Sequence, residues 1–408
     1  MIIIAAKNAF LRKKTGIEEY MCQILRSLAK SNTDEEIIVY TNKIEQLLNF
    51  PSNFHLKIIH LPFLWTQIGL SFKMLKIKLQ RKDFVLFIPA HVMPLIHPKK
   101  TIVTIHGLEY EYFPQYYSWL SRHYLRWSTR YATHYAWKII AVSHNTKKDL
   151  VKLYHCDSSK IKVIYHGMNK PWNIEHEAWS RQQKGNKYFL YLGRIELKKN
   201  VLGIIRAFEI LRDTEPTRNF GHGTDTEPQH KLSDYKLILA GPAGYGYKNI
   251  KYQMSNIKSE VRKDIVFTGH ISDRKKWELL RSAEALVFPS FYEGFGMPIL
   301  EAQAVGVPVI TSNNSSMREI TDMKFSIFNF QFSKRYSIKS SKPTNLRWES
   351  ALLVNPNSPE EIAEAMGRIV TDKNLRDELI RRGYENVKRF SWKKCGKKTL
   401  GVLLGKDY

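Results

Sequence analysis

The sequence predicts an α/β protein made of two doubly wound, Rossmann-like domains. The chain has 408 residues, and at roughly 150 residues per domain this length allows about two or three domains. Short apolar segments alternate with helical segments along both halves, a pattern typical of parallel sheets. The alternation breaks near residues 167–185, where Pro171, Trp172 and a polar run predict a linker.

The first half contains seven apolar segments of the length of a strand. The predicted strands are Ile2–Ala6, Ile37–Thr41, Lys57–His60, Phe84–Ile88, Ile102–Ile105, Ile139–Val142 and Lys162–Ile164. Helical periodicity between them predicts helices that include Glu18–Lys30 and Thr146–Leu153.

The second half repeats this rhythm. The predicted strands are Tyr188–Leu192, Lys236–Ala240, Asp264–Thr268, Ala285–Phe288 and Pro308–Thr311, and the predicted helices include Leu202–Arg212, Lys275–Ser282 and Pro359–Val370. Two stretches interrupt it: residues 213–234 are polar and read as a solvated loop, and residues 321–350 show no clear period.

Composition excludes several classes of protein. The chain carries 64 Lys and Arg against 38 Asp and Glu, a formal charge of +26 that is spread over both halves. No apolar run reaches the roughly 18 residues of a membrane span, and we expect residues 1–6 to form a first buried strand rather than a signal peptide. The cysteines Cys22, Cys156 and Cys395 lack the spacing of a zinc site or a disulfide framework, so we expect a cytoplasmic protein. The charge predicts an anionic partner without choosing among nucleic acid, membrane and polyphosphate.

The segment 285–310 carries the most chemistry, because it reads as strand, glycine-rich turn, helix, turn and strand. Gly294 and Gly296 allow a tight turn and the close approach of a ligand. Pro298 suits the first helical position, so the free amides of residues 295–297 (Phe295, Gly296 and Met297) predict an anion site at the helix start. Glu293 and Glu301 flank it, and carboxylates there suit the hydroxyl groups of a sugar and a ribose; taken alone, such a pair would more commonly be solvated surface acids.

The string from Tyr292 to Ala302 resembles the E-x7-E signature of family 4 retaining glycosyltransferases of the GT-B fold (glycosyl transferases group 1). A second segment, Tyr191-Leu-Gly-Arg-Ile-Glu-Leu-Lys-Lys-Asn, is similar to the phosphate-binding stretch of the same family. Arg194 and Lys199 lie on its turn, where two cations can clamp a diphosphate leaving group without a metal.

The first half resembles the family at two further places. His106 follows a predicted strand within Thr-Ile-His-Gly, which is similar to the His-Asp of the family, and the resemblance places it near the donor sugar. Gly107 stands where an Asp is common. Members of the family have paired glycines in the first turn, whose backbone approaches the donor phosphate. In this chain only Gly16 of that pair is present.

The resemblance implies GT-B architecture, with two Rossmann-like domains facing each other across a cleft. It implies an acceptor-binding domain at residues 1–172, a nucleotide-sugar-binding domain at 173–390, and a terminal helix at 391–408 that crosses back onto the first domain. Glu301 would hold the ribose hydroxyls, and Glu293 with the amides of residues 295–297 would orient the sugar. No DxD-type acidic pair is present at a donor site, so we expect neither metal nor cofactor.

The function implied is retaining transfer of a hexose from a nucleotide diphosphate sugar to a glycan or lipid-linked acceptor, in polysaccharide or lipopolysaccharide assembly. The stretch around Arg194 resembles mannosyltransferases, which favours GDP-mannose; a UDP-sugar-dependent glucosyl-, galactosyl- or GlcNAc-transferase is the alternative. A non-catalytic protein that binds anionic membranes on the same fold is the alternative from another class, and the intact motif argues against it.

Two basic stretches of the first half raise the question of a membrane surface. Residues 112–137 hold ten aromatic residues, with Arg122, Arg126 and Arg130 spaced by four, and residues 71–82 form a second basic amphipathic stretch. Such stretches suit the anionic inner face of the cytoplasmic membrane, or equally a half-buried helix with a solvated cationic face. Nucleic acid is excluded as a partner because no reading module is present.

Overall fold

The computed structural model describes residues 1–31, 33–80, 83–169, 187–213, 232–323 and 347–406. Contacts divide the chain into two compact units. The first unit contains residues 1–167 together with 390–408, and the second contains residues 168–389. The predicted boundary at 172/173 lies outside the described residues, as do most of the stretches 213–234 and 321–350.

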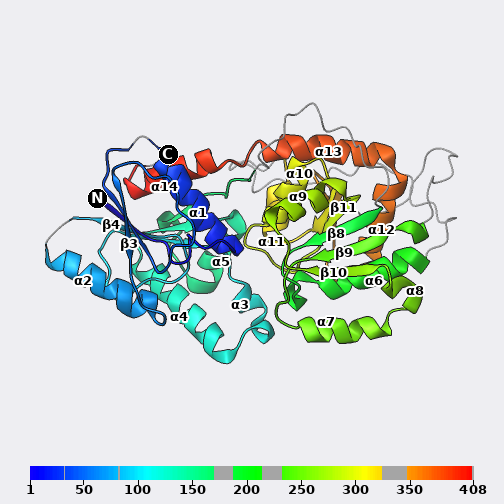
Figure 1. Ribbon diagram of the computed structural model, residues 1–408, viewed down its shortest axis with the longest axis horizontal. Coiled ribbons are helices and arrows are strands. Elements are labelled where there is room, and N and C mark those ends of the chain that lie inside the picture. The colour runs from blue at the N-terminus through cyan, green and yellow to red at the C-terminus, as the bar shows by residue number, and fades with distance from the viewer. Residues whose placement is uncertain (32, 81–82, 170–186, 214–231, 324–346, 407–408) are drawn as a thin grey trace. The chain divides into compact units, whose positions relative to one another are not determined.

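The described part of the first unit forms a parallel sheet of seven strands in the order β3-β2-β1-β4-β5-β6-β7 (Figure 1). The strands are β1 (Ile2–Ala5), β2 (Ile37–Thr41), β3 (Phe54–Ile58), β4 (Val85–Ile88), β5 (Thr101–Ile105), β6 (Lys138–Ala141) and β7 (Ile161–Val163). The helices are α1 (Gly16–Ala29), α2 (Ser71–Leu79), α3 (Glu109–Tyr112), α4 (Trp119–Tyr135), α5 (His144–Tyr154) and α14 (Trp392–Leu403). Single turns lie at η1 (Trp65–Leu70), η2 (Pro114–Tyr116) and η3 (Ser158–Lys160).

The described part of the second unit forms a similar sheet in the order β10-β9-β8-β11-β12-β14-β13, in which only β13 runs antiparallel. The strands are β8 (Tyr188–Leu192), β9 (Lys236–Ala240), β10 (Ile265–Gly269), β11 (Ala285–Phe288), β12 (Val309–Ser312), β13 (Arg347–Trp348) and β14 (Leu352–Val354). The helices are α6 (Val201–Asp213), α7 (Tyr247–Gln253), α8 (Ser259–Arg262), α9 (Asp273–Ser282), α10 (Met297–Ala304), α11 (Ser315–Thr321), α12 (Pro359–Thr371) and α13 (Lys373–Val387). Single turns lie at η4 (Leu197–Lys199), η5 (Leu232–Asp234) and η6 (Met254–Asn256).

The core of the first unit has two layers, one on each face of its sheet. Successive side chains of a strand point to opposite faces. Accordingly, Ile3 packs into the layer that contains Trp65, while Ile2 and Ile4 pack into the layer that contains α1. Burial on both faces explains why the central strands read as continuous apolar runs.

The terminal helix α14 packs on α1, within the first unit. Ser27 Oγ donates a hydrogen bond to the carbonyl oxygen of Trp392 at 2.7 Å. Gly396 allows this approach, because a Cβ there would lie 2.0 Å from Ser27 Oγ. The same holds at Gly167, where a Cβ would lie 2.1 Å from the backbone nitrogen of Trp392.

All twelve predicted strands correspond to observed strands, with one clear displacement. The strand predicted at Lys57–His60 begins three residues earlier, at Phe54, because the ring of Phe54 is buried and the residue pairs with Ile37 on β2. The short strands β13 and β14 were not predicted. β14 has three residues, too few to show a period in the sequence.

The other sequence expectations concern membranes and thiols. In the described part of the chain, no helix combines the length and the hydropathy of a membrane span. The three cysteines are buried and carry free thiols.

Candidate active site at the carboxyl ends of β8 and β11

The predicted site residues of the second unit follow the two strands at the centre of its sheet. β8 pairs with β9 on one side and with β11 on the other, so the order of the strands reverses there. In open α/β sheets, ligands bind beyond the carboxyl ends of the strands at such a switch point. The turn after β8 carries Arg194 and Lys199, and the loop after β11 carries Glu293.

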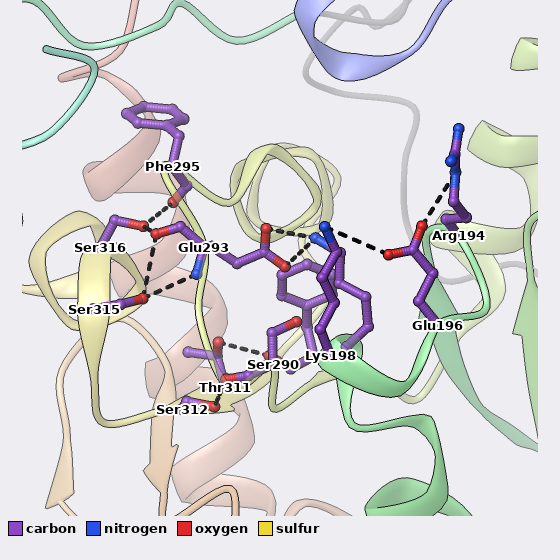
Figure 2. Close-up of polar contacts among 12 residues, drawn as sticks. Arg194, Glu196, Lys198, Ser290, Glu293, Phe295, Thr311, Ser312, Ser315 and Ser316 are labelled. Carbon is purple, nitrogen blue, oxygen red and sulfur yellow. Dashed lines mark hydrogen bonds and ion pairs between the residues drawn. The ribbon is translucent and has the colours of Figure 1, made fainter. Parts of the chain in front are cut away.

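The turn after β8 is organised around a buried acid, Glu196, which the sequence analysis missed. Its carboxylate lies 3.3 Å from Arg194 Nε and 3.6 Å from Lys198 Nζ (Figure 2). Glu196 is 6 % exposed, whereas about half of the Arg194 side chain is in solvent. The acid therefore anchors two cations, and the half-exposed guanidinium of Arg194 can contact an anion.

Tyr191, on β8, fixes the backbone of this turn. Tyr191 Oη donates a hydrogen bond to the carbonyl oxygen of Arg194 at 2.8 Å. Burial, followed by the charges of Glu293 and Glu196, holds the pKa of Tyr191 well above its usual value. The hydroxyl therefore stays protonated and remains a donor.

Close approach of two loops requires glycine at Gly193 and Gly241. Both residues have φ in the region that favours glycine, +152° and +147°. A Cβ on Gly241 would lie 1.9 Å from the carbonyl oxygen of Gly193. The loop after β9 consequently packs directly against the turn that carries the cations.

The backbone of the loop after β11 is fixed by hydrogen bonds to two serines at the start of α11. Ser315 Oγ accepts a hydrogen bond from the Glu293 amide at 3.1 Å. Ser316 Oγ lies 2.7 Å from the Glu293 carbonyl and 3.0 Å from the Phe295 carbonyl (Figure 2). These contacts fix the backbone on both sides of Gly294, so the Glu293 side chain has a defined direction.

The helix after this loop begins one residue earlier than predicted. Gly296 has φ +105° and caps the helix, so Met297 is the first helical residue and Pro298 the second. The first amides of a helix have no carbonyl partner within the helix, and the helix dipole favours an anion there. The predicted donor-binding residues Phe295, Gly296 and Met297 thus surround the start of α10.

The structure brings the two motifs together through Lys199 and Glu293, which are 94 residues apart in the sequence. Lys199 Nζ lies 2.5 Å and 2.6 Å from the two carboxylate oxygens. The Phe291 amide donates to the Lys198 carbonyl at 3.2 Å, which also joins the two loops. Glu293 is 8 % exposed, so this ion pair is largely shielded from water.

Glu301, on α10, has a partner that the sequence analysis did not identify. Lys276 Nζ of α9 lies 2.8 Å from Glu301 Oε1, and Glu301 is 6 % exposed. The same ammonium lies 4.7 Å from the centre of the Trp277 ring. The carboxylate is thus oriented by a lysine before any hydroxyl group of a ligand reaches it.

His106 belongs to the first unit and follows β5. Its Nε2 lies 3.1 Å from the Pro89 carbonyl, and its amide donates to His91 Nε2 at 3.0 Å. Burial, then the neighbouring His91, lowers the pKa of His106 to about 3, and burial lowers that of His91 to about 4. His106 is therefore neutral at pH 7. Its Nε2–H donates a hydrogen bond to the Pro89 carbonyl, and Nδ1 is the acceptor nitrogen of the ring.

Gly16, also in the first unit, is the first residue of α1. No atom lies within 4 Å of the position that its Cβ would occupy. The helix start is ordered by the Thr15 amide, which donates to Glu18 Oε2 at 2.7 Å. The open space beside Gly16 leaves room for a ligand against the backbone.

Two family models match the chain, one in each half. Residues 174–386 match the model described as glycosyl transferases group 1. Residues 14–170 match the model described as glycosyltransferase family 4. Together they include Gly16, His106, Arg194, Lys199, Glu293 and Glu301.

Two known proteins similar to this chain are mannosyltransferases of O-antigen chains, and one of them matches nearly its whole length. The O-antigen chain mannosyltransferase B of Escherichia coli is 24 % identical over 98 % of this chain and 99 % of its own. The O-antigen chain mannosyltransferase RfbU of Salmonella typhimurium is 28 % identical over 56 % of each chain.

Solved structures extend the comparison to the fold. WaaG, a glycosyltransferase involved in lipopolysaccharide biosynthesis, superposes with a TM-score of 0.66 at 14 % identity, over 99 % of this chain and 100 % of its own. The sucrose-phosphate synthase of Thermosynechococcus elongatus gives 0.69 at 16 % identity, over 99 % and 98 %. HepE of Anabaena, in complex with UDP-glucose, gives 0.64 at 16 % identity, over 99 % of each chain. These likenesses show that the predicted GT-B fold is correct.

Proposed function

The chain belongs to the glycosyl transferases group 1 family and is a glycosyltransferase, and we propose that it is a retaining hexosyltransferase that uses a nucleotide diphosphate sugar. The observation that carries this proposal is the ion pair between Lys199 and Glu293 at the switch point of the second sheet. It joins a cation suited to a diphosphate with an acid suited to a sugar hydroxyl.

The cations of the turn after β8 would neutralise the leaving group. Charge develops on the diphosphate as the bond to the sugar breaks, and fixed cations stabilise that charge without reorganisation. Arg194 and Lys199 would supply them, with Glu196 holding Arg194 in place. The same two cations support a reaction that needs no metal or cofactor.

The transfer would need no reactant other than the donor and the acceptor. The acceptor hydroxyl oxygen forms a bond to C1 of the sugar, the bond from C1 to the phosphate oxygen breaks on the same face, and the hydroxyl proton passes to that phosphate oxygen. Glu293 and the amides at the start of α10 would orient the sugar, and Glu301 would accept hydrogen bonds from the ribose hydroxyls. His106, neutral at pH 7, would serve as a hydrogen-bond acceptor near the sugar and would not be a general acid.

The donor we propose is GDP-mannose, and the mannosyltransferase names of two relatives support its sugar. Both relatives named above are mannosyltransferases of O-antigen chains. The HepE structures, which hold UDP-glucose or UDP and glucose, favour a UDP-sugar as the second candidate. The acceptor would be a glycan or a lipid-linked glycan, reached by a peripheral protein at the inner face of the cytoplasmic membrane.

A thermal-shift panel tests the proposal. GDP, UDP, ADP and their sugars are each added to the full chain, and the melting temperature is recorded. One base should raise it clearly above the others, because a ligand that binds only the folded state stabilises it. No response to any of these nucleotides would exclude a nucleotide-sugar site.

A further inference from the structure

The helices η1, α2 and α4 of the first unit carry apolar side chains on their solvent side. Leu64, Ile68, Phe72, Leu75 and Leu79 recur every three or four residues, which places them on one side of the helix. Their exposed fractions run from 36 % for Leu75 to 74 % for Leu79. The core of the unit is instead filled from this segment by Trp65, Leu70 and Met74.

A second row of side chains, mostly aromatic and all exposed except the partly buried Tyr131, runs along α4. Its members are Leu120, Tyr124, Trp127, Tyr131 and Tyr135, again spaced by three or four residues. Tyr124, Trp127 and Tyr131 stack in succession, with ring centres 5.9 Å and 5.6 Å apart, and the Tyr135 ring lies tilted at 4.7 Å from Tyr131. Tyr131 packs against the core of the unit and thereby anchors this row.

The two rows meet at Gln67. Its Nε2 donates hydrogen bonds to Tyr124 Oη at 3.2 Å and to the Met93 carbonyl at 3.0 Å. Figure 1 draws α2 and α4 along the same edge of the first unit. We call the two rows together the apolar face. Soluble monomers rarely expose a continuous apolar surface of this kind unless something binds there.

The charged residues of the helices that form the apolar face are all basic. The residues of η1, α2 and α4 include Lys73, Lys76, Lys78, Arg122, Arg126 and Arg130 and not one Asp or Glu. Arg126 pairs with Glu111 of α3, whereas Lys76 and Lys78 are exposed. Lys73 and Lys76 also line a pocket with Lys57, in which Glu36 is the acidic residue.

We propose that the apolar face docks onto an anionic phospholipid bilayer, with its apolar side chains in the interface and its lysines and arginines against lipid phosphates. Amphipathic helices with Trp, Phe and Leu on one face and Lys or Arg beside them lie in the plane of the interface, and Trp and Tyr favour the level of the headgroups. A second copy of the chain fits less well, because a two-fold contact through this face would place like charges against each other.

This inference rests on the membrane location proposed above but not on the sugar donor. Binding to vesicles and binding of a nucleotide can therefore fail separately. Calorimetric titration of GDP and UDP into each variant gives that second readout.

The test is co-sedimentation of the full chain with vesicles of phosphatidylcholine alone or with 30 mol % phosphatidylglycerol, a composition of about one anionic lipid in three. We expect partition onto the anionic vesicles to exceed that onto neutral ones by at least about ten-fold, and to fall with salt, because each lysine near an anionic leaflet contributes about five-fold. Equal partition onto both kinds of vesicle would overturn the proposal.

Matched variants locate the contact. Phe72→Ser with Leu79→Ser should lower partition by about ten-fold or more, since each loses a large apolar side chain from the interface. Leu47→Ser with Tyr252→Ser, at residues equally exposed but outside the apolar face, should leave it unchanged. Lys76→Glu with Lys78→Glu should weaken binding more than Lys393→Glu with Lys394→Glu, which alters the net charge equally on α14.

Two further measurements complete the test. Melting curves establish that each variant folds; if the first double variant does not, Trp127→Ser takes its place. Sedimentation velocity detects a second copy as the occupant. A dimer that Phe72→Ser dissociates, or equal losses in the matched variants, would contradict membrane docking.

Discussion

Lys199 Nζ lies within 2.6 Å of both carboxylate oxygens of Glu293, across the junction between the loops after β8 and β11. The pair joins the two sequence motifs of the site into one electrostatic unit. A diphosphate entering the site would compete with Glu293 for the lysine, and the freed carboxylate could then accept hydrogen bonds from a sugar. The ion pair thus holds both side chains in position before the donor arrives.

Replacing Glu293 by Gln should lower the rate of sugar transfer by at least about 100-fold, since a group that orients the reacting sugar is lost. The size of the side chain is retained, so the melting temperature should change little. The matched control is Glu284→Gln, which removes an ion pair of 3.0 Å to Arg376 in the same unit. Equal activity losses in the two variants would remove Glu293 from the active site.

Replacing Lys199 by Met should weaken the binding of nucleoside diphosphates by about 10- to 100-fold, the range expected for a lost hydrogen bond to a charged group. Binding of the nucleoside without phosphates should not change. Calorimetric titration of both ligands measures the difference. Lys187→Met, which removes a pair with Asp234, is the control. A loss that is the same for nucleoside and diphosphate would contradict the assigned role of Lys199.

Replacement by alanine should lower the stability of the protein at Gly241 but not at Gly16. Gly241→Ala should destabilise the second unit by at least about 2 kcal/mol, because the Cβ would clash with the Gly193 carbonyl at a strained φ. Gly16→Ala meets no atom of the protein, so its stability should stay within about 0.5 kcal/mol of the parent. If donor phosphates approach Gly16, its KM for the donor should nevertheless rise. Denaturant unfolding and steady-state kinetics separate the two effects.

Acid should destabilise the first unit through two histidines, His91 and His106, whose pKa values are lowered in the folded chain. Burial holds the pKa of His91 at about 4 and that of His106 at about 3, below the ordinary value of about 6.5 in an unfolded chain. Between these values the unfolded chain binds more protons, so the stability present above pH 6.5 is lost as the pH falls toward 4.

Denaturant unfolding between pH 7.5 and 4.5 should show this decline. His91→Gln combined with His106→Gln should reduce the pH dependence of the unfolding free energy by about two bound protons. An identical slope in the double variant would mean that these histidines are protonated in the folded chain.

The sequence predicted the strands and the turns that carry the site because apolar runs, glycines and prolines report local backbone requirements. Arg194, Lys199, Glu293 and the start of α10 could be placed at strand ends for this reason. The one-residue error at Pro298 arose because Gly296, with its positive φ, caps the helix.

Contacts between distant segments could not be predicted in the same way. Glu301 meets Lys276 only because α9 and α10 lie next to each other, and Glu196 becomes the anchor of two cations only because the turn buries it. His91, 15 residues before His106, is brought to it by the pairing of β4 with β5. Such contacts depend on strand order and burial, which cannot be predicted from the local pattern of a single sequence.

The measurement that tests the account most directly follows the anomeric configuration of the sugar by proton NMR. The full chain is incubated with GDP-mannose, and in parallel with UDP-glucose, UDP-galactose and UDP-GlcNAc, with water as the acceptor. We predict that one donor is consumed, that the first free sugar released has the α configuration of that donor, and that Glu293→Gln releases none. Release of the β anomer first, or no consumption of any of the four donors, would contradict retaining sugar transfer at this site.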